Sequence, residues 1–216
     1  MRFQMDADPD YQMSLDELAY FLSVCEKFDY KFKFIISGGE PLMWKNLKSG
    51  LKMLRDSKVC QNIVLYSNGI NIQVVDEETI SLCDTFRISR YQYNTSNINN
   101  IKSKFPQLVV VDRKQHWKVP LEPVENVFPE DCGLKNELFL YRGRVYFCPM
   151  CPPITIQQKL DIITSVEVNY ETGFLEGLKQ LEKDHKPTLC PCCTWNKKIR
   201  AKYCSIPNIS SRLKAL

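Results

Sequence analysis

The stretch ISGGEP, residues 36–41, follows the apolar run KFKFI and ends it with a serine, two glycines, a glutamate and a proline. A pair of glycines lets a ligand approach the backbone without meeting a Cβ, and Pro41 holds the exit of the loop because its φ is fixed. Phosphate is the usual ligand of such a loop, but the negative charge of Glu40 would repel it. A carboxylate beside exposed carbonyls favours a cationic group, such as the ammonium of an amino acid. The stretch therefore predicts an amine-binding loop at the end of a buried strand.

Helices and strands alternate on both sides of this loop. The spacing of apolar residues predicts helices over residues 14–28, 44–57 and 76–83 and around Ile98 and Ile101, and strands over residues 31–37, 62–68, 85–91 and 108–112. The first helix begins with Ser14 and Glu17, the serine and glutamate of a capping box. Strands that alternate with helices every 20 to 30 residues pair in parallel through right-handed crossovers. We expect an α/β fold, either an open sheet or part of a barrel.

Polar residues stand where the expected strands end, and function gathers at the carboxyl ends of parallel strands. The four ends are Gly38-Gly39-Glu40, Ser67-Asn68-Gly69, Ser89-Arg90-Tyr91 and Asp112-Arg113. For the second of these taken by itself, polar residues that merely end a buried strand are the better interpretation. For the glycine-rich loop a ligand is the better one.

Composition limits the class of protein. The chain has 216 residues, 44% of them hydrophobic, and a net charge of +4. These values are ordinary for a globular protein with one core and a small appendage, and the aromatic residues are not interleaved with arginine as on a nucleic-acid surface. The acidic start MRFQMDADPD does not have the apolar segment of a signal peptide, and no apolar run approaches the length of a membrane span. We expect a cytoplasmic protein that binds neither membranes nor nucleic acid.

Cysteines are distributed unevenly along the chain. Of the ten, Cys25, Cys60 and Cys83 lie singly in apolar surroundings and are expected to be core residues. The other seven crowd the second half, and the change in composition near Pro120 predicts two domains, residues 1–120 and 121–216. A reducing cytosol would keep these cysteines as thiols or metal ligands.

The cysteine-rich half contains two pairs that could share one metal site. Residues 137–141 and 144–148 form an expected β-hairpin with its turn at Arg142-Gly143, so Cys132 and Cys148 would come together at its open end. Cys190 and Cys193 have the Cys-x2-Cys spacing of a chelating pair. Two such pairs predict a four-thiolate site, and the spacing leaves zinc and iron–sulfur open.

The first half resembles the radical S-adenosylmethionine (radical SAM) enzymes over about residues 14–113, through ISGGEP and the following strand end YSNGI. The resemblance implies a partial (βα)n TIM-like barrel whose Gly-Gly-Glu-Pro loop binds the amino group of S-adenosylmethionine. It also implies that the next two strand ends approach the rest of the cofactor. The cofactor-binding residues implied in this way are Gly38, Gly39, Glu40, Pro41, Ser67, Asn68, Ser89 and Arg90.

The resemblance is incomplete at the start of the chain. Radical SAM enzymes carry a Cys-x3-Cys-x2-Cys loop after a first strand, and that loop holds the catalytic [4Fe–4S] cluster. The corresponding region here, MRFQMDADPDYQMS, has no cysteine, and the barrel is expected to lack its first strand. Either an enzyme has been truncated or a relative has lost the radical chemistry. In both cases we expect this chain by itself not to cleave S-adenosylmethionine.

The second half is similar to the twitch and SPASM domains of radical SAM enzymes, which hold auxiliary [4Fe–4S] clusters. This favours one iron–sulfur cluster over zinc, with the expected ligands Cys132, Cys148, Cys190 and Cys193 and the alternates Cys151 and Cys192. The leading hypothesis is a radical SAM-type enzyme acting on a small-molecule or peptide substrate, with a reductant protein as a further partner. The alternatives are an iron–sulfur module without radical chemistry and a zinc-stabilised interaction protein.

Overall fold

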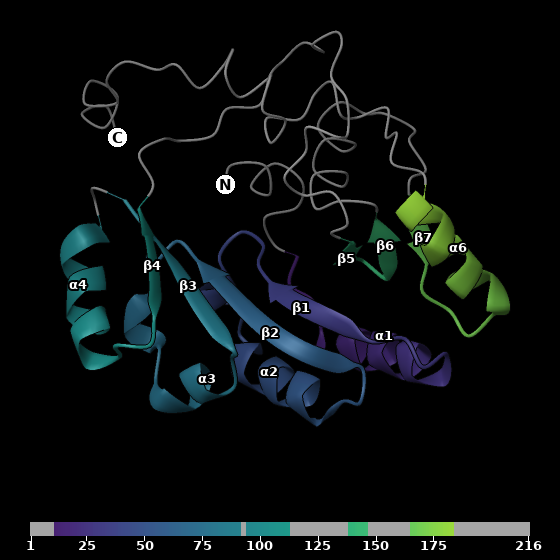
Figure 1. Cartoon of the computed structure of the whole chain (residues 1–216), viewed down its shortest axis with the longest axis horizontal. Coiled ribbons are helices and arrows are strands. Elements are labelled where there is room, and N and C mark those ends of the chain that lie inside the picture. The colour runs from purple at the N-terminus through teal and green to yellow at the C-terminus, as the bar shows by residue number, and fades with distance from the viewer. Residues whose placement is uncertain (1–10, 92–93, 113–137, 147–164, 184–216) are drawn as a thin grey trace, which may run out of the picture. The chain divides into compact units, whose positions relative to one another are not determined.

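The structure, a computed structural model, describes residues 11–91, 94–112, 138–146 and 165–183 (Figure 1). Contacts group these residues into two compact units. The first unit holds the described residues up to 112 together with Val168–Leu175, and the second holds residues 138–146, 165–167 and 176–183. The expected domain boundary near residue 120 lies outside the described residues.

The first unit is built on a parallel sheet with the strand order β1-β2-β3-β4. Its strands are β1 (Phe32–Ile36), β2 (Cys60–Ser67), β3 (Thr85–Arg90) and β4 (Val109–Asp112). Its helices are α1 (Leu15–Lys27), α2 (Leu47–Asp56), α3 (Glu77–Ser81) and α4 (Thr95–Lys104), with the 3-10 turns η1 (Pro41–Met43) and η2 (Ile72–Val74). Every helix and strand expected between residues 14 and 112 is therefore present. The expected cap is also confirmed, since Oγ of Ser14 accepts a 3.0 Å hydrogen bond from the backbone N–H of Glu17.

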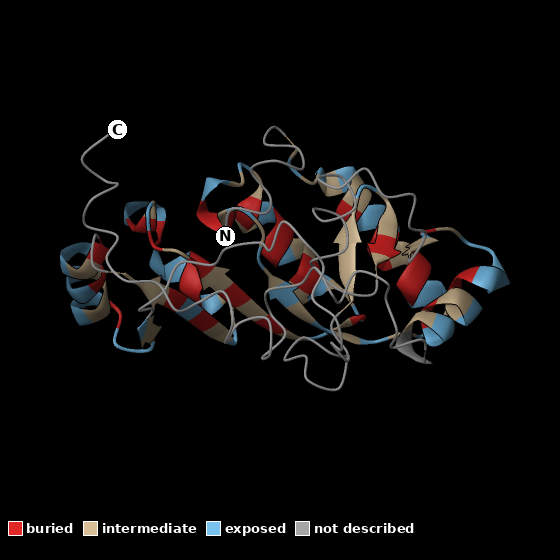
Figure 2. Cartoon of the chain, turned by 90° about the horizontal axis from the view of Figure 1, so that it is seen from above, coloured by how far each residue is buried: buried red, intermediate tan, exposed pale blue. Residues whose placement is uncertain are grey.

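One face of this sheet packs against the helices. In Figure 1, α1, α2 and α3 lie on the same side of the strands, and Figure 2 shows the buried positions that run along strands and helices. The ring of Phe21 on α1 contacts those of Phe32 and Phe34 on β1. Leu65 of β2 and Ile88 of β3 are completely buried. The strands therefore follow one another in chain order across the sheet, with α1, α2 and α3 on one side of it.

The opposite side of the sheet, which we call the open face, carries Ile35, Val64, Tyr66, Arg87 and Val109. These residues share a face because the parallel register places Ile35 beside Val64, Tyr66 beside Arg87 and Arg87 beside Val109. Ile35 is 42% exposed and Val109 41% exposed, although both are apolar.

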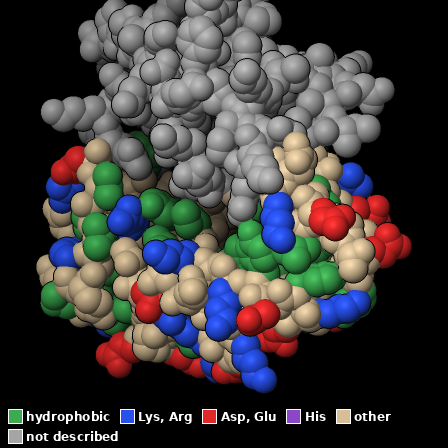
Figure 3. Space-filling model, turned by 45° about the vertical axis from the view of Figure 1, so that its right-hand side comes forward, with side chains coloured by type: hydrophobic (Ala, Val, Ile, Leu, Met, Phe, Trp, Pro, Cys, Tyr) green, Lys and Arg blue, Asp and Glu red, His purple; other side chains and the backbone are tan. Residues whose placement is uncertain are grey.

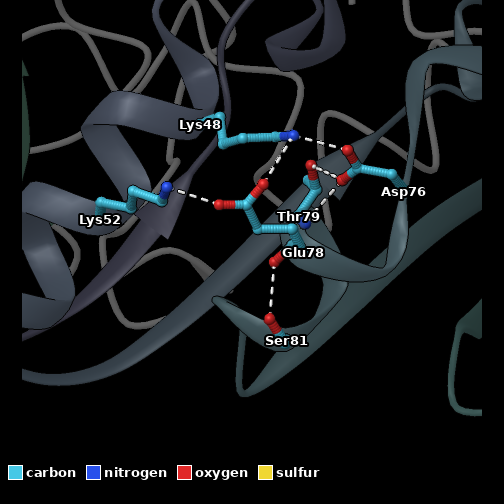
Figure 4. Close-up of polar contacts among 6 residues, drawn as sticks. All are labelled: Lys48, Lys52, Asp76, Glu78, Thr79 and Ser81. Atoms are coloured by element: carbon cyan, nitrogen blue, oxygen red, sulfur yellow. Dashed lines mark hydrogen bonds and ion pairs between the residues drawn. The ribbon is translucent and has the colours of Figure 1, made fainter.

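Ion pairs connect α2 to α3 (Figure 4). Nζ of Lys48 lies 2.5 Å from Asp76 and 3.0 Å from Glu78, and Nζ of Lys52 lies 2.5 Å from Glu78. Asp76 also caps α3, because its Oδ1 accepts hydrogen bonds from the backbone N–H and the hydroxyl of Thr79. Hydrogen bonds hold the pKa of Asp76 well below its usual range, and the bond from Lys48 contributes more than those from Thr79. The charged side chains of this cluster are largely exposed, whereas Thr79 is buried, so the cluster orients α3 on the surface.

The second unit contains the expected hairpin. Strands β5 (Phe139–Tyr141) and β6 (Arg144–Tyr146) pair antiparallel, and the turn residues Arg142 and Gly143 have φ values of 50° and 67°. Positive φ at both turn residues matches the right-handed twist of a two-residue hairpin. A third strand that was not expected, β7 (Ser165–Glu167), pairs antiparallel with β6.

Helix α6 (Thr172–Lys183) follows β7, and its Gly177 lies against Val166. A Cβ at position 177 would lie 2.8 Å from Cγ2 of Val166, so glycine permits the close approach. Among the described helices, none has the length and apolar character needed to cross a membrane.

Candidate functional site

The loop after β1 is shaped by its glycines and its proline. Gly38 has a φ of 146°, a conformation that side chains with a Cβ rarely adopt. Pro41 is buried and begins the 3-10 turn η1. Glu40 caps that turn, because its Oε1 accepts a 3.0 Å hydrogen bond from the backbone N–H of Leu42. The loop therefore leaves the strand in one defined conformation.

The carboxylate of Glu40 also binds the end of β2. Its Oε1 accepts a 2.7 Å hydrogen bond from the hydroxyl of Ser67, and its Oε2 accepts one of 2.7 Å from the backbone N–H of Asn68. With the bond from Leu42 the carboxylate has three donors, while its two oxygens offer about four acceptor positions. Glu40 thus connects the loop after β1 to the end of β2 through hydrogen bonds and also carries a negative charge. Its carboxylate keeps one acceptor position beyond these three hydrogen bonds.

The turn after β2 is held by its own side chains. Ser67 is buried, and its Oγ accepts a 2.9 Å hydrogen bond from the backbone N–H of Gly69. Oδ1 of Asn68 accepts one of 2.8 Å from the backbone N–H of Ile70. Gly69 has a φ of 74°, and a Cβ there would lie 3.0 Å from Cγ2 of Ile88. Both its backbone conformation and its surroundings require glycine.

A residue that sequence analysis missed connects the ends of β2 and β3. Asn94 is only 3% exposed. Its Nδ2 donates to the carbonyl oxygens of Asn68, at 2.6 Å, and Ser89, at 3.2 Å, and its Oδ1 accepts from the backbone N–H of Tyr91 at 2.7 Å. An asparagine just before an expected helix suggests a cap for that helix, but the side chain of Asn94 makes no cap hydrogen bond to α4. It binds the strand ends instead.

An ion pair connects the ends of β3 and β4. Nε and Nη2 of Arg90 lie 2.6 Å and 3.0 Å from the two carboxylate oxygens of Asp112, and Nη1 donates a 2.9 Å hydrogen bond to Oδ1 of Asn99. Hydrogen bonding to Asp112 raises the pKa of Arg90 above its ordinary value. Asp112 was recognised in the sequence only as a polar strand end, because its pairing with Arg90 depends on the register of the two strands.

The carboxyl ends of all four parallel strands thus form one connected edge. Hydrogen bonds run from Glu40 to the end of β2, from there through Asn94 to the end of β3, and from Arg90 to the end of β4. The structure brings the eight residues implied as cofactor ligands to this edge: Gly38, Gly39, Glu40, Pro41, Ser67, Asn68, Ser89 and Arg90. The fixed carboxylate of Glu40 and the glycine backbone at this edge suit a cationic group of a ligand.

The expected metal ligands lie outside the described residues: Cys132, Cys148, Cys190, Cys193 and the alternates Cys151 and Cys192. Within the described ranges, no group of three or more His, Cys, Asp or Glu side chains could hold a metal ion. Cys25 is completely buried, as expected for a core residue, and burial raises the pKa of its thiol to about 12. Cys60 and Cys83 are only half-buried.

Solved structures that are similar in fold to this chain include two of BtrN. The chain superposes on the open conformation of BtrN with a TM-score of 0.51 at 15% sequence identity, covering 88% of this chain and 85% of that one. It also superposes on BtrN in complex with AdoMet and 2-DOIA with a TM-score of 0.55 at 13% identity, covering 93% and 82%. BtrN is a radical SAM enzyme.

The chain has a radical SAM-like fold. At these identities the likeness concerns the fold only. No protein-family model matches the sequence, and no curated protein matches it. In this radical SAM-like fold, the Gly-Gly-Glu-Pro loop stands at the carboxyl edge of the parallel sheet, which is the edge at which α/β folds bind ligands.

Proposed function

We propose that the carboxyl edge of β1, β2 and β3 binds S-adenosylmethionine and that the chain is the cofactor-binding part of a radical SAM-type enzyme. The observation that carries the proposal is the carboxylate of Glu40, held by Ser67 and Asn68 at this edge. The fold supports it, because one of the BtrN structures with this fold is in complex with AdoMet.

The loop after β1 fits the ammonium of the cofactor. Glu40 has one acceptor position left after its three hydrogen bonds, and Gly38 and Gly39 leave the neighbouring backbone open to a ligand. Because the carboxylate is already held in place, little conformational freedom is lost when the ammonium binds. In this proposal the ammonium contacts both features that the sequence predicts for the loop, the acidic side chain and the exposed carbonyls.

The end of β3 fits the other polar groups of the cofactor. A guanidinium has five N–H donors, and Arg90 uses three of them on Asp112 and Asn99. The hydroxyl of Ser89, on the open face, can bind a ribose hydroxyl. Arg90 points to the opposite face, toward Asn99 of α4, so its remaining donors would bind the carboxylate of the cofactor around the end of the strand. These two roles follow the resemblance in the sequence and belong to the proposal.

The cysteines of the second half would hold an auxiliary [4Fe–4S] cluster in a twitch-like or SPASM-like segment. The proposed ligands are Cys132, Cys148, Cys190 and Cys193, with Cys151 and Cys192 as alternates. When bound, such a cluster supplies a one-electron redox centre. Thiolates in two pairs are also the donors that zinc prefers, so metal analysis decides between the two.

A second candidate is a binding module that has lost the radical chemistry. Residues 1–24 contain no cysteine, so within this chain they could not hold a catalytic cluster. Cys25 cannot serve as a substitute, since it is completely buried on α1.

Isothermal titration calorimetry of the full chain, purified without oxygen, tests the binding of S-adenosylmethionine. We expect saturable binding in the wild type, at least tenfold weaker binding in Glu40→Gln and none in Glu40→Lys, because the lysine places a cation beside the ammonium. Glu26→Gln is the matched control, since Glu26 also accepts hydrogen bonds from a serine and a backbone N–H, but at the far end of the unit. Unchanged binding in a folded Glu40→Lys variant would remove the loop from the site.

Production of 5′-deoxyadenosine separates the two candidates. The reconstituted chain, reduced with dithionite, is expected to produce none above a control without clusters. If the chain is part of an enzyme, addition of an upstream segment with a Cys-x3-Cys-x2-Cys loop should start production. If it is a binding module, production stays absent with the added segment.

A further inference from the structure

The open face carries an arginine that is held by an aromatic residue. Arg87 and Tyr66 lie directly opposite each other on β3 and β2. Nη1 of Arg87 donates a 2.8 Å hydrogen bond to the hydroxyl of Tyr66, and its guanidinium carbon lies 5.5 Å from the centroid of the ring. Two interactions with one neutral side chain therefore orient the guanidinium without neutralising its charge.

Other arginines of the same unit are paired differently. Arg55 forms an ion pair with Asp84, and Arg90 forms one with Asp112. For Arg87 the part of the chain that the structure describes supplies no ion pair. With one proton committed to Tyr66, the guanidinium keeps four donors, including the parallel pair on Nε and Nη2 that matches the two oxygens of a carboxylate or phosphate.

The surroundings of Arg87 on the open face combine hydroxyl and apolar side chains. Thr85 and Ser89 lie two positions from it on β3 and share its face. Val109 lies opposite it on β4, and Ile35 and Val64 lie side by side one layer away on β1 and β2. All three are exposed or half-buried. Figure 3 shows a face of the molecule on which hydrophobic and basic side chains lie next to one another. A cation beside exposed apolar side chains and two hydroxyl groups is complementary to a ligand with an anionic group on a carbon skeleton.

Arg87 is also close to the edge at which the cofactor is proposed to bind. It precedes Ser89 by two residues on β3, and Tyr66 precedes Asn68 by two residues on β2. Residues two apart on a strand share a face and are separated by about 7 Å along it. A group held by Arg87 would therefore lie within the length of one small molecule from the cofactor.

We propose that Arg87, held by Tyr66, binds the carboxylate or phosphate group of the substrate, whose carbon skeleton lies over Ile35, Val64 and Val109. This rests on the proposed function, because the open face is a substrate site only if the neighbouring edge holds S-adenosylmethionine. The substrate is accordingly an anionic small molecule.

The test uses the full chain labelled with ¹⁵N-arginine and two probes, inorganic phosphate and succinate. We expect one Nε–Hε resonance, absent in Arg87→Gln, to shift saturably with at least one probe. Calorimetry should show at least fivefold weaker binding of that probe to Arg87→Gln. Lys58→Gln removes one positive charge from an exposed position before β2, at the opposite end of that strand, and should bind like the wild type. Tyr66→Phe keeps the ring but removes the hydroxyl, and should weaken binding less than Arg87→Gln does.

The outcomes separate this proposal from the one on which it rests. The tighter of the two probes shows whether the group is a phosphate or a carboxylate. Equal binding of both probes to the wild type and Arg87→Gln overturns the assignment, as does displacement of the probe by S-adenosylmethionine, which would place Arg87 in the cofactor site. If S-adenosylmethionine does not bind but the probe still requires Arg87, the cofactor proposal fails and the anion site stands.

Discussion

The hydroxyl of Ser67 donates a 2.7 Å hydrogen bond to Oε1 of Glu40, a residue 27 positions earlier in the chain. The same hydroxyl oxygen accepts a hydrogen bond from the backbone N–H of Gly69, so both its donor and its acceptor roles are used. Glu40 is therefore positioned by the end of the neighbouring strand as well as by its own loop. The candidate site depends on the pairing of β1 with β2.

Ser67→Ala tests this relationship through stability. The substitution leaves the buried N–H of Gly69 without its acceptor and removes one donor from Glu40, which should lower the free energy of unfolding by about 1–3 kcal/mol. Urea denaturation measures the change. Ser103→Ala is the control, because Ser103 is exposed on α4 and its hydroxyl donates to the carbonyl of Asn99 in the same helix; we expect a change within about 0.5 kcal/mol. Equal effects of the two substitutions would show that the hydrogen bonds of Ser67 do not stabilise the carboxyl edge of the sheet.

Gly69→Ala should destabilise the turn after β2. Its φ of 74° costs a residue with a Cβ about 1–2 kcal/mol, and the new Cβ would lie 3.1 Å from Cδ1 of Ile98 and 3.0 Å from Cγ2 of Ile88. Thermal unfolding followed by circular dichroism measures the loss. Gly173→Ala, in the first turn of α6 with no atom within 4 Å of the new Cβ, should be neutral or stabilising by up to about 1 kcal/mol. A neutral Gly69→Ala would contradict the backbone conformation of the turn.

The interactions of Asp84 predict that the free energy of unfolding falls in acid. Its carboxylate accepts a 2.7 Å hydrogen bond from the backbone N–H of Ile63 and forms a 2.8 Å ion pair with Arg55, and these two partners lower its pKa in the folded protein. A lowered pKa stabilises the fold above the unfolded value of about 3.9, and the contribution is lost as the pH falls through the folded value. The urea midpoint should therefore fall less between pH 5 and acid in Asp84→Asn than in the wild type. Asp56→Asn, which removes an exposed carboxyl group at the end of α2, controls for the change in net charge. Equal slopes in the wild type and Asp84→Asn would contradict the prediction.

The cluster prediction is tested by metal analysis of protein purified and reconstituted without oxygen. We expect about four irons and four sulfides per chain. Cys148→Ala and Cys193→Ala should each remove the cluster. Stoichiometric zinc without sulfide would instead establish a zinc site.

Cys83→Ala is the control for the cluster prediction and should keep the iron and sulfide. Burial raises the pKa of the Cys83 thiol to about 11, and its Sγ donates to the carbonyl of Thr79 at 3.4 Å. The Cys83 thiol thus binds the carbonyl of a residue one turn earlier in its own chain segment, which places it outside the proposed ligand set. Loss of iron in Cys83→Ala would show that the ligand set has been assigned wrongly.

The sequence by itself determined the order of helices and strands between residues 14 and 112 and the hairpin at Arg142-Gly143. It also determined that a loop shaped by glycine and proline follows β1. These features follow from interactions over a few positions, such as apolar periodicity, the cap at Ser14 and the φ preferences of glycine and proline. The strand β7 was not predicted, because its three residues are too few to show a period and no short turn joins it to β6, unlike β5.

Only the tertiary structure decided how the strand ends are connected. The bonds of Glu40 reach 27 and 28 positions along the chain, and the bond from Asn94 to Asn68 reaches 26. Likewise Tyr66 and Arg87, 21 positions apart, meet because the register of β2 and β3 sets them opposite each other. Such partners depend on strand register, which no local pattern in the sequence encodes, since a shift of one residue would turn each side chain to the other face.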